Sequence, residues 1–358
     1  MIVFIAIFIV ICLFGIRLRP AEGEKYMTDY MSVDKTMAIK GIFIIIVFFS
    51  HFNSYVQYTL SLDLAYLKYF SMIGQCMVTL FMFYSGYGVM ESVKKKKMPY
   101  VKKMPITRVL GTLFRFDIAI LLFAALYLIL RMNFTLKQFL LSLIAWDAIG
   151  NSNWYIFAIL ICYLITYIAF MIFREKGNFY PAAAAVTVGI VLYVFILRYF
   201  NLKDVWWYDT IILYACGIWY SLLREKIEKM INHNLITYFC TFAVVLVGAL
   251  YFMKNRNNSF VHLEMCMVLF TAAVVVFSMR VSLNNAVLRW CGQHLFGLYI
   301  LQRLPMIAFK ALKMDEFNIY LYFVLCLAVT VFMAWLFEKY VGKLWKMLTS
   351  PKIQKKSD

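Results

Sequence analysis

Charged residues are scarce in this sequence, and acidic residues (18) are half as numerous as basic ones (36). Asp, Glu, Lys and Arg make up only 15% of the 358 residues, whereas roughly 25% is usual for a soluble globular protein. Because 64% of the residues are hydrophobic, the chain is neither disordered nor collagen-like. The mean hydropathy of +0.77 and the long apolar runs indicate a protein that crosses a membrane several times.

Several signatures of soluble proteins are also missing. The sequence contains no GxSxG, HExxH or P-loop motif, which argues against the common hydrolase, protease and nucleotide-binding classes. All eight cysteines lie within or at the edges of apolar stretches, without a CxxC pair, so we expect buried thiols and no metal site. No stretch between apolar blocks exceeds about 20 residues, so we expect no soluble domain.

The apolar runs predict an all-α polytopic membrane bundle. Since about 20 apolar residues are needed for a helix to cross a bilayer, we count eleven segments, at 2–16, 38–55, 69–90, 108–130, 153–173, 179–198, 208–223, 235–253, 260–279, 294–312 and 319–338. We expect a ten-helix core preceded by an N-terminal anchor helix. The predicted regions are an anchor and cytoplasmic linker (1–32), a membrane domain (33–338) and a basic cytoplasmic tail (339–358).

The basic residues predict the orientation in the membrane. No Lys or Arg precedes the first apolar run and Arg17 follows it, which favours an uncleaved anchor with its N-terminus outside. In that orientation 25 Lys and Arg residues fall on the cytoplasmic side and 10 on the outer side, as the positive-inside rule requires. We therefore expect a multi-pass protein of the plasma membrane with a cytoplasmic C-terminus.

The net charge of +18 does not indicate a nucleic-acid partner, because in so apolar a chain the cations mark cytoplasmic loops. The run Lys94 to Lys97 is either a topology determinant attracted to anionic lipid headgroups or part of a ligand site.

Lys40 and His51 are the most informative polar residues within the apolar runs. They lie eleven residues apart, which places them on one face of a helix and about 16 Å apart along its axis. Ionisable groups at membrane depth are costly and are therefore functional candidates. The alternative is a lysine that extends to the membrane surface and an interfacial histidine.

Other polar positions allow two interpretations. The stretch Ser85-Gly86-Tyr87-Gly88 brings small residues into a bulky helix, which favours close helix packing. Arg115 and Asp117 are two residues apart and need partners on other helices; Arg115 either pairs structurally or meets an anion. Trp154 begins a segment at the outer interface, where an aromatic residue is expected in any case.

Four stretches, in order, resemble acyltransferase family 3, the multi-span membrane acyltransferases that include polysaccharide O-acetyltransferases. They are Ala38-Ile39-Lys40 running to His51, Leu80 to Tyr87 ending in Ser85-Gly86-Tyr87, Asn153-Trp154-Tyr155-Ile156-Phe157, and Gly292 to Gln302. The resemblance covers about residues 33–338. It departs from the family pattern at Leu295, where serine is usual, and at Gln302, where histidine is usual.

The resemblance implies transfer of an acyl group, usually acetyl, from cytosolic acyl-coenzyme A to a hydroxyl of a polysaccharide, or of its lipid-linked precursor, at or beyond the outer face. Coenzyme A would be a substrate, with no permanently bound cofactor. The cations expected near the donor phosphates are Lys40, Lys102, Lys103, Arg108 and Arg115, since phosphate pairs with Lys and Arg.

The resemblance and the chemistry of imidazole make His51 the candidate general base, with Lys40 as its partner in the catalytic pair. Transient acylation of His51 is the alternative. Ser85, Tyr87, Trp154 and Tyr299 are candidates for the acceptor path, or else serve packing and interface anchoring. A transporter or flippase for a lipid-linked sugar is the competing class, although no matching pattern of prolines in two halves supports it.

Overall fold

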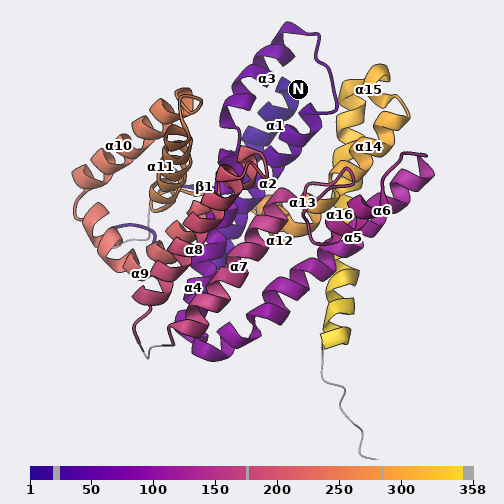
Figure 1. The fold of residues 1–358 in the computed structure, drawn as a ribbon. Coiled ribbons are helices and arrows are strands. Elements are labelled where there is room, and N and C mark those ends of the chain that lie inside the picture. The colour runs from indigo at the N-terminus through magenta and orange to yellow at the C-terminus, as the bar shows by residue number, and fades with distance from the viewer. Residues whose placement is uncertain (19–24, 175–176, 284, 350–358) are drawn as a thin grey trace, which may run out of the picture.

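The computed structural model describes residues 1–18, 25–174, 177–283 and 285–349, and these residues form an almost entirely helical bundle (Figure 1). Its helices are α1 (Ile2–Leu13), α2 (Val33–Asn53), α3 (Ser61–Ile73), α4 (Cys76–Met104), a π-helix η1 (Pro105–Leu110), α5 (Gly111–Ile129), α6 (Leu136–Leu143), α7 (Trp154–Ile172), α8 (Tyr180–Tyr199), a 3-10 turn η2 (Val205–Trp207), α9 (Ile212–Ile231), α10 (Leu235–Lys254), α11 (Phe260–Ser278), α12 (Ala286–Gln293), α13 (Leu295–Leu301), α14 (Arg303–Ala311), α15 (Met314–Phe317) and α16 (Ile319–Thr349). Arg19, Lys176 and the tail lysines Lys352, Lys355 and Lys356 lie outside the described residues.

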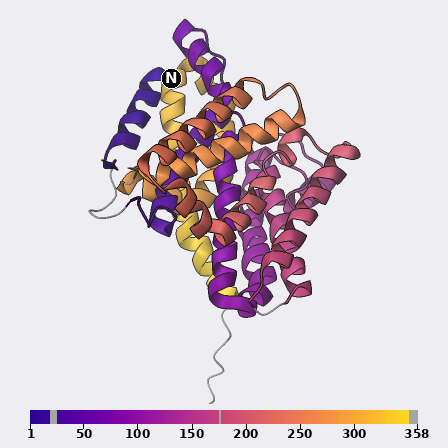
Figure 2. The ribbon, with the colours of Figure 1, turned by 90° about the vertical axis from the view of Figure 1, so that its left-hand side faces the viewer.

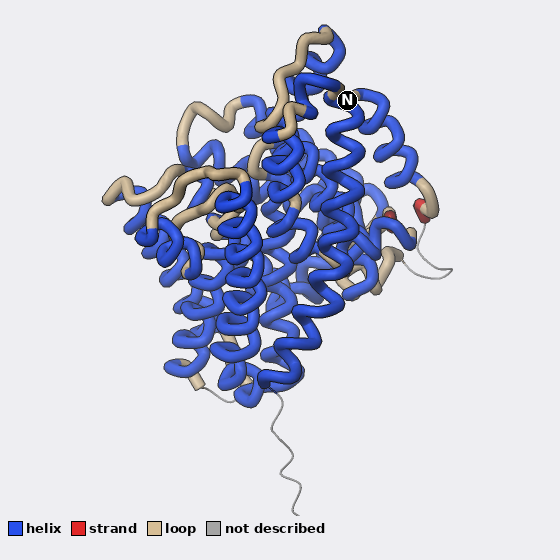
Figure 3. The backbone as a smooth tube through the Cα atoms, turned by 90° about the vertical axis from the view of Figure 1, so that its right-hand side faces the viewer, coloured by secondary structure: helices blue, strands red, loops and turns tan. Residues whose placement is uncertain are grey.

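The structure confirms the predicted fold class, an all-helical membrane bundle. Six helical stretches of the described chain are long and apolar enough to cross a membrane: Ser61–Ile129, Trp154–Ile172, Tyr180–Tyr199, Leu235–Lys254, Phe260–Ser278 and Ile319–Thr349. The helices of the bundle run largely alongside one another (Figure 3). The count of eleven crossings stays a prediction. The sheet in the described part is one antiparallel pair, β1 (Ile16–Arg17) with β2 (Ser282–Leu283).

Several helix boundaries differ from the predicted segments. Gly74, at a φ of 50°, separates α3 from α4, and α4 continues past the lysine run to Met104 with a kink at Lys97. The predicted segment 294–312 is broken at Gln302 into α13 and α14. The last helix runs to Thr349, so the first part of the predicted basic tail is helical. Hydropathy marks apolar depth in the bilayer, whereas helical hydrogen bonding continues into the polar interface.

Hydrogen bonds join segments that the charge pattern assigns to the same side of the membrane. At one end, Lys310 Nζ donates to the carbonyl oxygen of Tyr55 at 2.9 Å. At the other end, Lys35 Nζ donates to Ser282 Oγ at 3.0 Å. The two predicted sides therefore correspond to two ends of the bundle, and the assignment of one end to the cytoplasm stays a prediction.

Helix α1 packs against the bundle. Figure 2 shows it beside α16, where the Phe4 ring stacks on Phe323 at a centroid distance of 4.6 Å. The N-terminal ammonium of Met1 forms an ion pair with Asp63 on α3 at 2.7 Å. The helix expected to be an added anchor is thus attached to the bundle through both an apolar face and a buried charge pair.

Glycines allow two helices in the centre of the bundle, α4 and α9, to approach closely. At the crossing of α4 and α9, a methyl group added to Gly86 would overlap the carbonyl oxygen of Tyr214, and one added to Gly217 would overlap that of Phe83. Close backbone approach at small residues is a common way for membrane helices to associate. The crossing fixes the face of α4 that carries Ser85.

We therefore expect Gly86→Ala to destabilise the protein, whereas Gly88→Ala, two residues along the same helix, should be tolerated. A methyl group at Gly88 would have no atom within 4 Å, while at Gly86 the backbones must separate, at a typical overpacking cost of about 1–3 kcal/mol. The measurement is the thermal unfolding midpoint of the detergent-solubilised variants. Equal midpoints for the two variants would contradict the packing described for α4 and α9.

Candidate active site

Helix α2 carries the two residues on which the site is built. The helix begins after Ser32, whose hydroxyl accepts a hydrogen bond from the Lys35 backbone amide at 3.4 Å. It packs against α4, α12 and α13. Its 21 helical residues include Lys40 and His51 about three turns, or about 16 Å, apart on one face. The predicted spacing is confirmed by the continuous helix between them.

His51 lies near the end of α2, half-buried among polar and aromatic groups. Its Nε2 is 3.5 Å from the hydroxyl of Ser152, which stands just before α7. Its Nδ1 is buried and has no hydrogen-bond partner in the described structure. Its ring lies 6.3 Å from that of Tyr299 on α13. With Ser152 accepting from Nε2–H, the imidazole would be neutral with Nδ1 free to accept a proton.

A column of hydroxyl-bearing side chains leads from His51 along the face of α2. The Tyr299 ring contacts Tyr155 of α7 edge-on at 5.5 Å. The hydroxyl of Ser85 on α4 interacts with Tyr155 and with Tyr163, two turns further along α7. We refer to Ser85, Tyr155, Tyr163 and Tyr299 as the polar column. It brings together side chains from α4, α7 and α13 in an otherwise apolar interior.

Lys40 and Arg108 lie at the far end of the polar column. The Lys40 ammonium lies 5.5 Å from the centre of the Tyr84 ring and forms no ion pair or hydrogen bond within the described part of the chain. The Arg108 Nε donates to Tyr100 Oη at 3.1 Å, and its guanidinium lies 5.9 Å from the centre of the Tyr163 ring. The positive charges of Arg108 and Lys40 are close enough to repel each other. Neither cation has a carboxylate partner among the residues that the structure describes, so the two form a site suited to an anion.

The π-helix η1 determines where Arg108 lies. It replaces α-helical turns between α4 and α5 over Pro105–Leu110, and π-helical insertions commonly occur at functional sites. The η1 segment packs against both α4 and α7, so Arg108 is half-buried beside Tyr163 rather than exposed. Lys102 and Lys103, in the last turn of α4, are exposed and lie at the same end of the bundle.

Three of the other predicted site residues have different surroundings. Arg115 forms an ion pair with Glu338 of α16 at 3.6 Å, and the other oxygen of Glu338 accepts from the Gly297 amide at 3.3 Å. Tyr87 accepts a hydrogen bond from Arg224 at 2.9 Å, away from the polar column. The Trp154 ring contacts Tyr155 at 6.0 Å.

Apart from Lys102 and Lys103, which are exposed at the end of α4, the predicted residues fall into two groups. The structure gathers Lys40, His51, Ser85, Arg108 and Tyr299 around the polar column, with Trp154 at its edge. It ties Arg115 to α16 and Tyr87 to α9.

Four contributors to the site were not selected from the sequence: Tyr84, Ser152, Tyr155 and Tyr163. Ser152 stands between two asparagines at the start of an apolar run, which is a weak polar signal. The three tyrosines lie in apolar runs and do not stand out there, because tyrosine is common in this sequence, with 25 in all. Tyr84 and Tyr155 lie within two of the four family stretches, but only the contacts between helices place them, with Tyr163, in the site.

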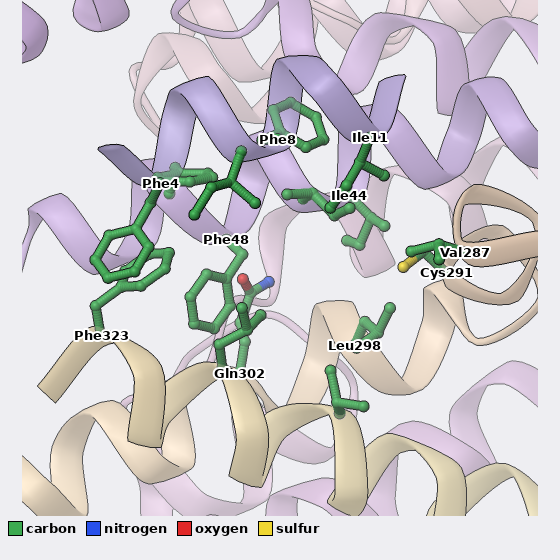
Figure 4. Close-up of a pocket in the computed structure, with 15 residues that line it drawn as sticks. Phe4, Phe8, Ile11, Ile44, Phe48, Val287, Cys291, Leu298, Gln302 and Phe323 are labelled. Carbon is green, nitrogen blue, oxygen red and sulfur yellow. The ribbon is translucent and has the colours of Figure 1, made fainter. Parts of the chain in front are cut away.

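A cavity of about 220 Å³ lies between α1, α2, α12, α13 and α16. Its lining is apolar except for Gln302 and the thiol of Cys291 (Figure 4). The Gln302 amide nitrogen donates to the carbonyl oxygen of Tyr299 at 3.0 Å. No charged side chain lines this cavity, so it is unsuited to an anionic ligand.

A family model described as an acyltransferase domain matches residues 37–339. The chain belongs to acyltransferase family 3. The match includes every residue of the polar column, together with Lys40, His51 and Arg108, and begins after α1. It confirms the resemblance seen in the sequence and makes the protein a membrane acyltransferase. No curated protein and no solved structure matches the chain.

Proposed function

We propose that this acyltransferase transfers an acetyl group from cytosolic acetyl-coenzyme A to a hydroxyl of a cell-surface polysaccharide, or of its lipid-linked precursor, on the outer side of the plasma membrane. The observation that carries the proposal is the polar column. Within the described part of the chain, it links Lys40 and Arg108, which have no carboxylate partner, to an imidazole nitrogen of His51 that has no hydrogen-bond partner. A donor bound at one end could thus reach an acceptor at the other.

The donor would bind at the end of the column that the charge pattern places on the cytoplasmic side. Lys40 and Arg108 would pair with its phosphates, as guanidinium and ammonium groups do in other phosphate sites. The exposed Lys102 and Lys103 would raise the local concentration of the polyanion. The extended pantetheine arm would then lie along the polar column, whose hydroxyl and aromatic groups suit its amides and methylenes.

At the other end, the unpartnered Nδ1 of His51 would remove the proton from the acceptor hydroxyl as its oxygen attacks the thioester carbonyl. The new bond is the ester C–O bond, and the bond that breaks is the C–S bond of the donor. The proton on His51 then passes to the departing thiolate, so the imidazole returns to its neutral form. Transfer through an acyl-imidazole would use the same nitrogen and deliver the acyl group in two steps.

Labelled acetyl-coenzyme A tests the proposed reaction. Membranes that contain the protein should incorporate label into surface glycan and release one free thiol for each acetyl group transferred, whereas membranes without it should do neither. A transporter of lipid-linked sugar would release no thiol. Absence of both products in membranes that supply donor and glycan would refute the proposed donor and acceptor.

A further inference from the structure

A pocket opens at the end of the bundle where His51 lies. It has a volume of about 450 Å³ and is lined by Tyr55, Tyr127, Gly150, Arg303 and Lys310, with Met132, Ile307 and Ala311. We refer to it as the outer pocket. Gly150 belongs to the same loop as Ser152, whose hydroxyl faces His51, so the wall of the pocket continues into the surroundings of the imidazole.

The charge in the outer pocket is positive and only partly compensated. Arg303 Nε donates to the hydroxyl of Tyr55 at 3.0 Å, and the guanidinium has no carboxylate partner within the described residues. Lys310 donates to the carbonyl oxygen of Tyr55 and lies 3.9 Å from Asp315. One cation is therefore without a counterion, and the other has a distant one. A guanidinium in this state retains several donors for an anionic oxygen.

Arg303 links the outer pocket to His51. Tyr299 and Arg303 are one helical turn apart across the break at Gln302, so their side chains leave the same face. The Arg303 guanidinium is close enough to both the His51 and the Tyr299 side chains to interact with them electrostatically. A ligand held by Arg303 is consequently placed next to the base.

The walls of the outer pocket suit a sugar. Tyr127 provides an aromatic face together with a hydroxyl group, a combination that accepts both the apolar faces and the hydroxyls of a carbohydrate. The Tyr55 ring lies against the two cations, with its centre 5.5 Å from the Arg303 guanidinium and 5.9 Å from the Lys310 ammonium. Gly150 has a φ of +73°, and a Cβ there would lie 2.7 Å from Tyr127 Oη. The pocket thus depends on a position that has no side chain.

From these contacts we propose that the outer pocket binds an anionic group of the acceptor, either the carboxylate of an acidic sugar or the phosphate of a lipid-linked precursor. Arg303 pairs with the anion, and a hydroxyl of the same molecule then lies beside His51. This inference rests on the proposed function and adds the chemical class of the acceptor. Arg303 is a positioning residue in this arrangement.

Binding to the full-length protein in lipid nanodiscs tests the inference, with excess coenzyme A present to occupy the donor site. The probes are a hexuronate disaccharide, inorganic diphosphate and a neutral disaccharide. We expect one of the anionic probes to bind at least ten times more tightly than the neutral one. Tight binding of the hexuronate would indicate an acidic glycan, and tight binding of diphosphate a lipid-linked precursor.

Variants of Arg303 separate the outer pocket from other basic surfaces. Arg303→Gln should remove the preference for the anionic probe, and Arg303→Lys should retain part of it. Lys313→Gln is the matched control, because the Lys313 side chain is 77% exposed and lies outside the pocket lining. Equal binding of charged and neutral probes, or a preference that survives Arg303→Gln, would overturn the inference. Because binding needs no turnover, this result is independent of whether acetyl transfer is detected.

Discussion

Replacement of His51 by alanine is expected to abolish acyl transfer while the amount of folded protein in the membrane stays the same. General-base catalysis typically contributes about 10²–10⁴-fold to a rate, and a side chain that is half-buried beside Ser152 has no neighbouring imidazole to replace it. The loss should therefore be at least about 100-fold in the turnover number, with little change in the apparent KM for acetyl-coenzyme A. The measurement is incorporation of labelled acetyl groups by membranes with matched protein levels.

A second histidine variant provides the control for this experiment. His233 is exposed at the end of α9, so His233→Ala removes an imidazole without touching the polar column and should keep wild-type activity. Ser152→Ala should have a smaller effect than His51→Ala, because it removes only a 3.5 Å contact that orients the ring. Full activity of the His51 variant would contradict a role for this residue as the base.

The second large effect is expected at the donor end of the polar column. Lys40→Gln and Arg108→Gln should each raise the apparent KM for acetyl-coenzyme A by roughly 10–100-fold, because a hydrogen bond to a charged group contributes about 1.5–3 kcal/mol. The turnover number at saturating donor should change much less, because neither side chain lies at His51. The measurement is the dependence of thiol release on donor concentration.

A nearby lysine distinguishes specific donor contacts from general positive charge. Lys95 is exposed on α4 and carries the same charge, so Lys95→Gln should leave the KM within about twofold of the wild-type value, as expected for exposed charges in high dielectric. Dephospho-coenzyme A derivatives, which lack one phosphate, should show a smaller difference between the wild type and the Lys40 or Arg108 variants. An unchanged KM in both variants would exclude the donor site described here.

Much of the protein could be predicted from the sequence because the relevant information is local. Apolar runs of membrane-spanning length show a helical membrane protein without any knowledge of packing. The spacing of Lys40 and His51 depends only on the helical repeat, so their shared face was predictable from eleven residues of one helix. The four family motifs are likewise short, and their order along the chain was sufficient to indicate acyltransferase family 3, which the match over residues 37–339 confirms.

Local sequence could not predict which side of a helix faces the site, or which residues form ion pairs. Ser85 and Tyr87 are two residues apart on α4 and therefore point to nearly opposite sides, yet both lie in one motif. Only the close crossing of α4 with α9 turns Ser85 toward Tyr155 and Tyr163 and leaves Tyr87 beside Arg224. Arg115 pairs with Glu338, a partner more than two hundred residues away in the chain.

The sequence by itself determined the membrane class, the family and the helix that carries Lys40 and His51, since each of these follows from composition or from a repeat within one segment. The tertiary structure decided which residues accompany that pair. The π-helix η1 places Arg108 near Lys40, and the loop before α7 places Ser152 beside His51. Tyr155 and Tyr299 come from helices that are far apart in the chain. Contacts between distant segments depend on how whole helix faces pack, and no local pattern of residues encodes that packing.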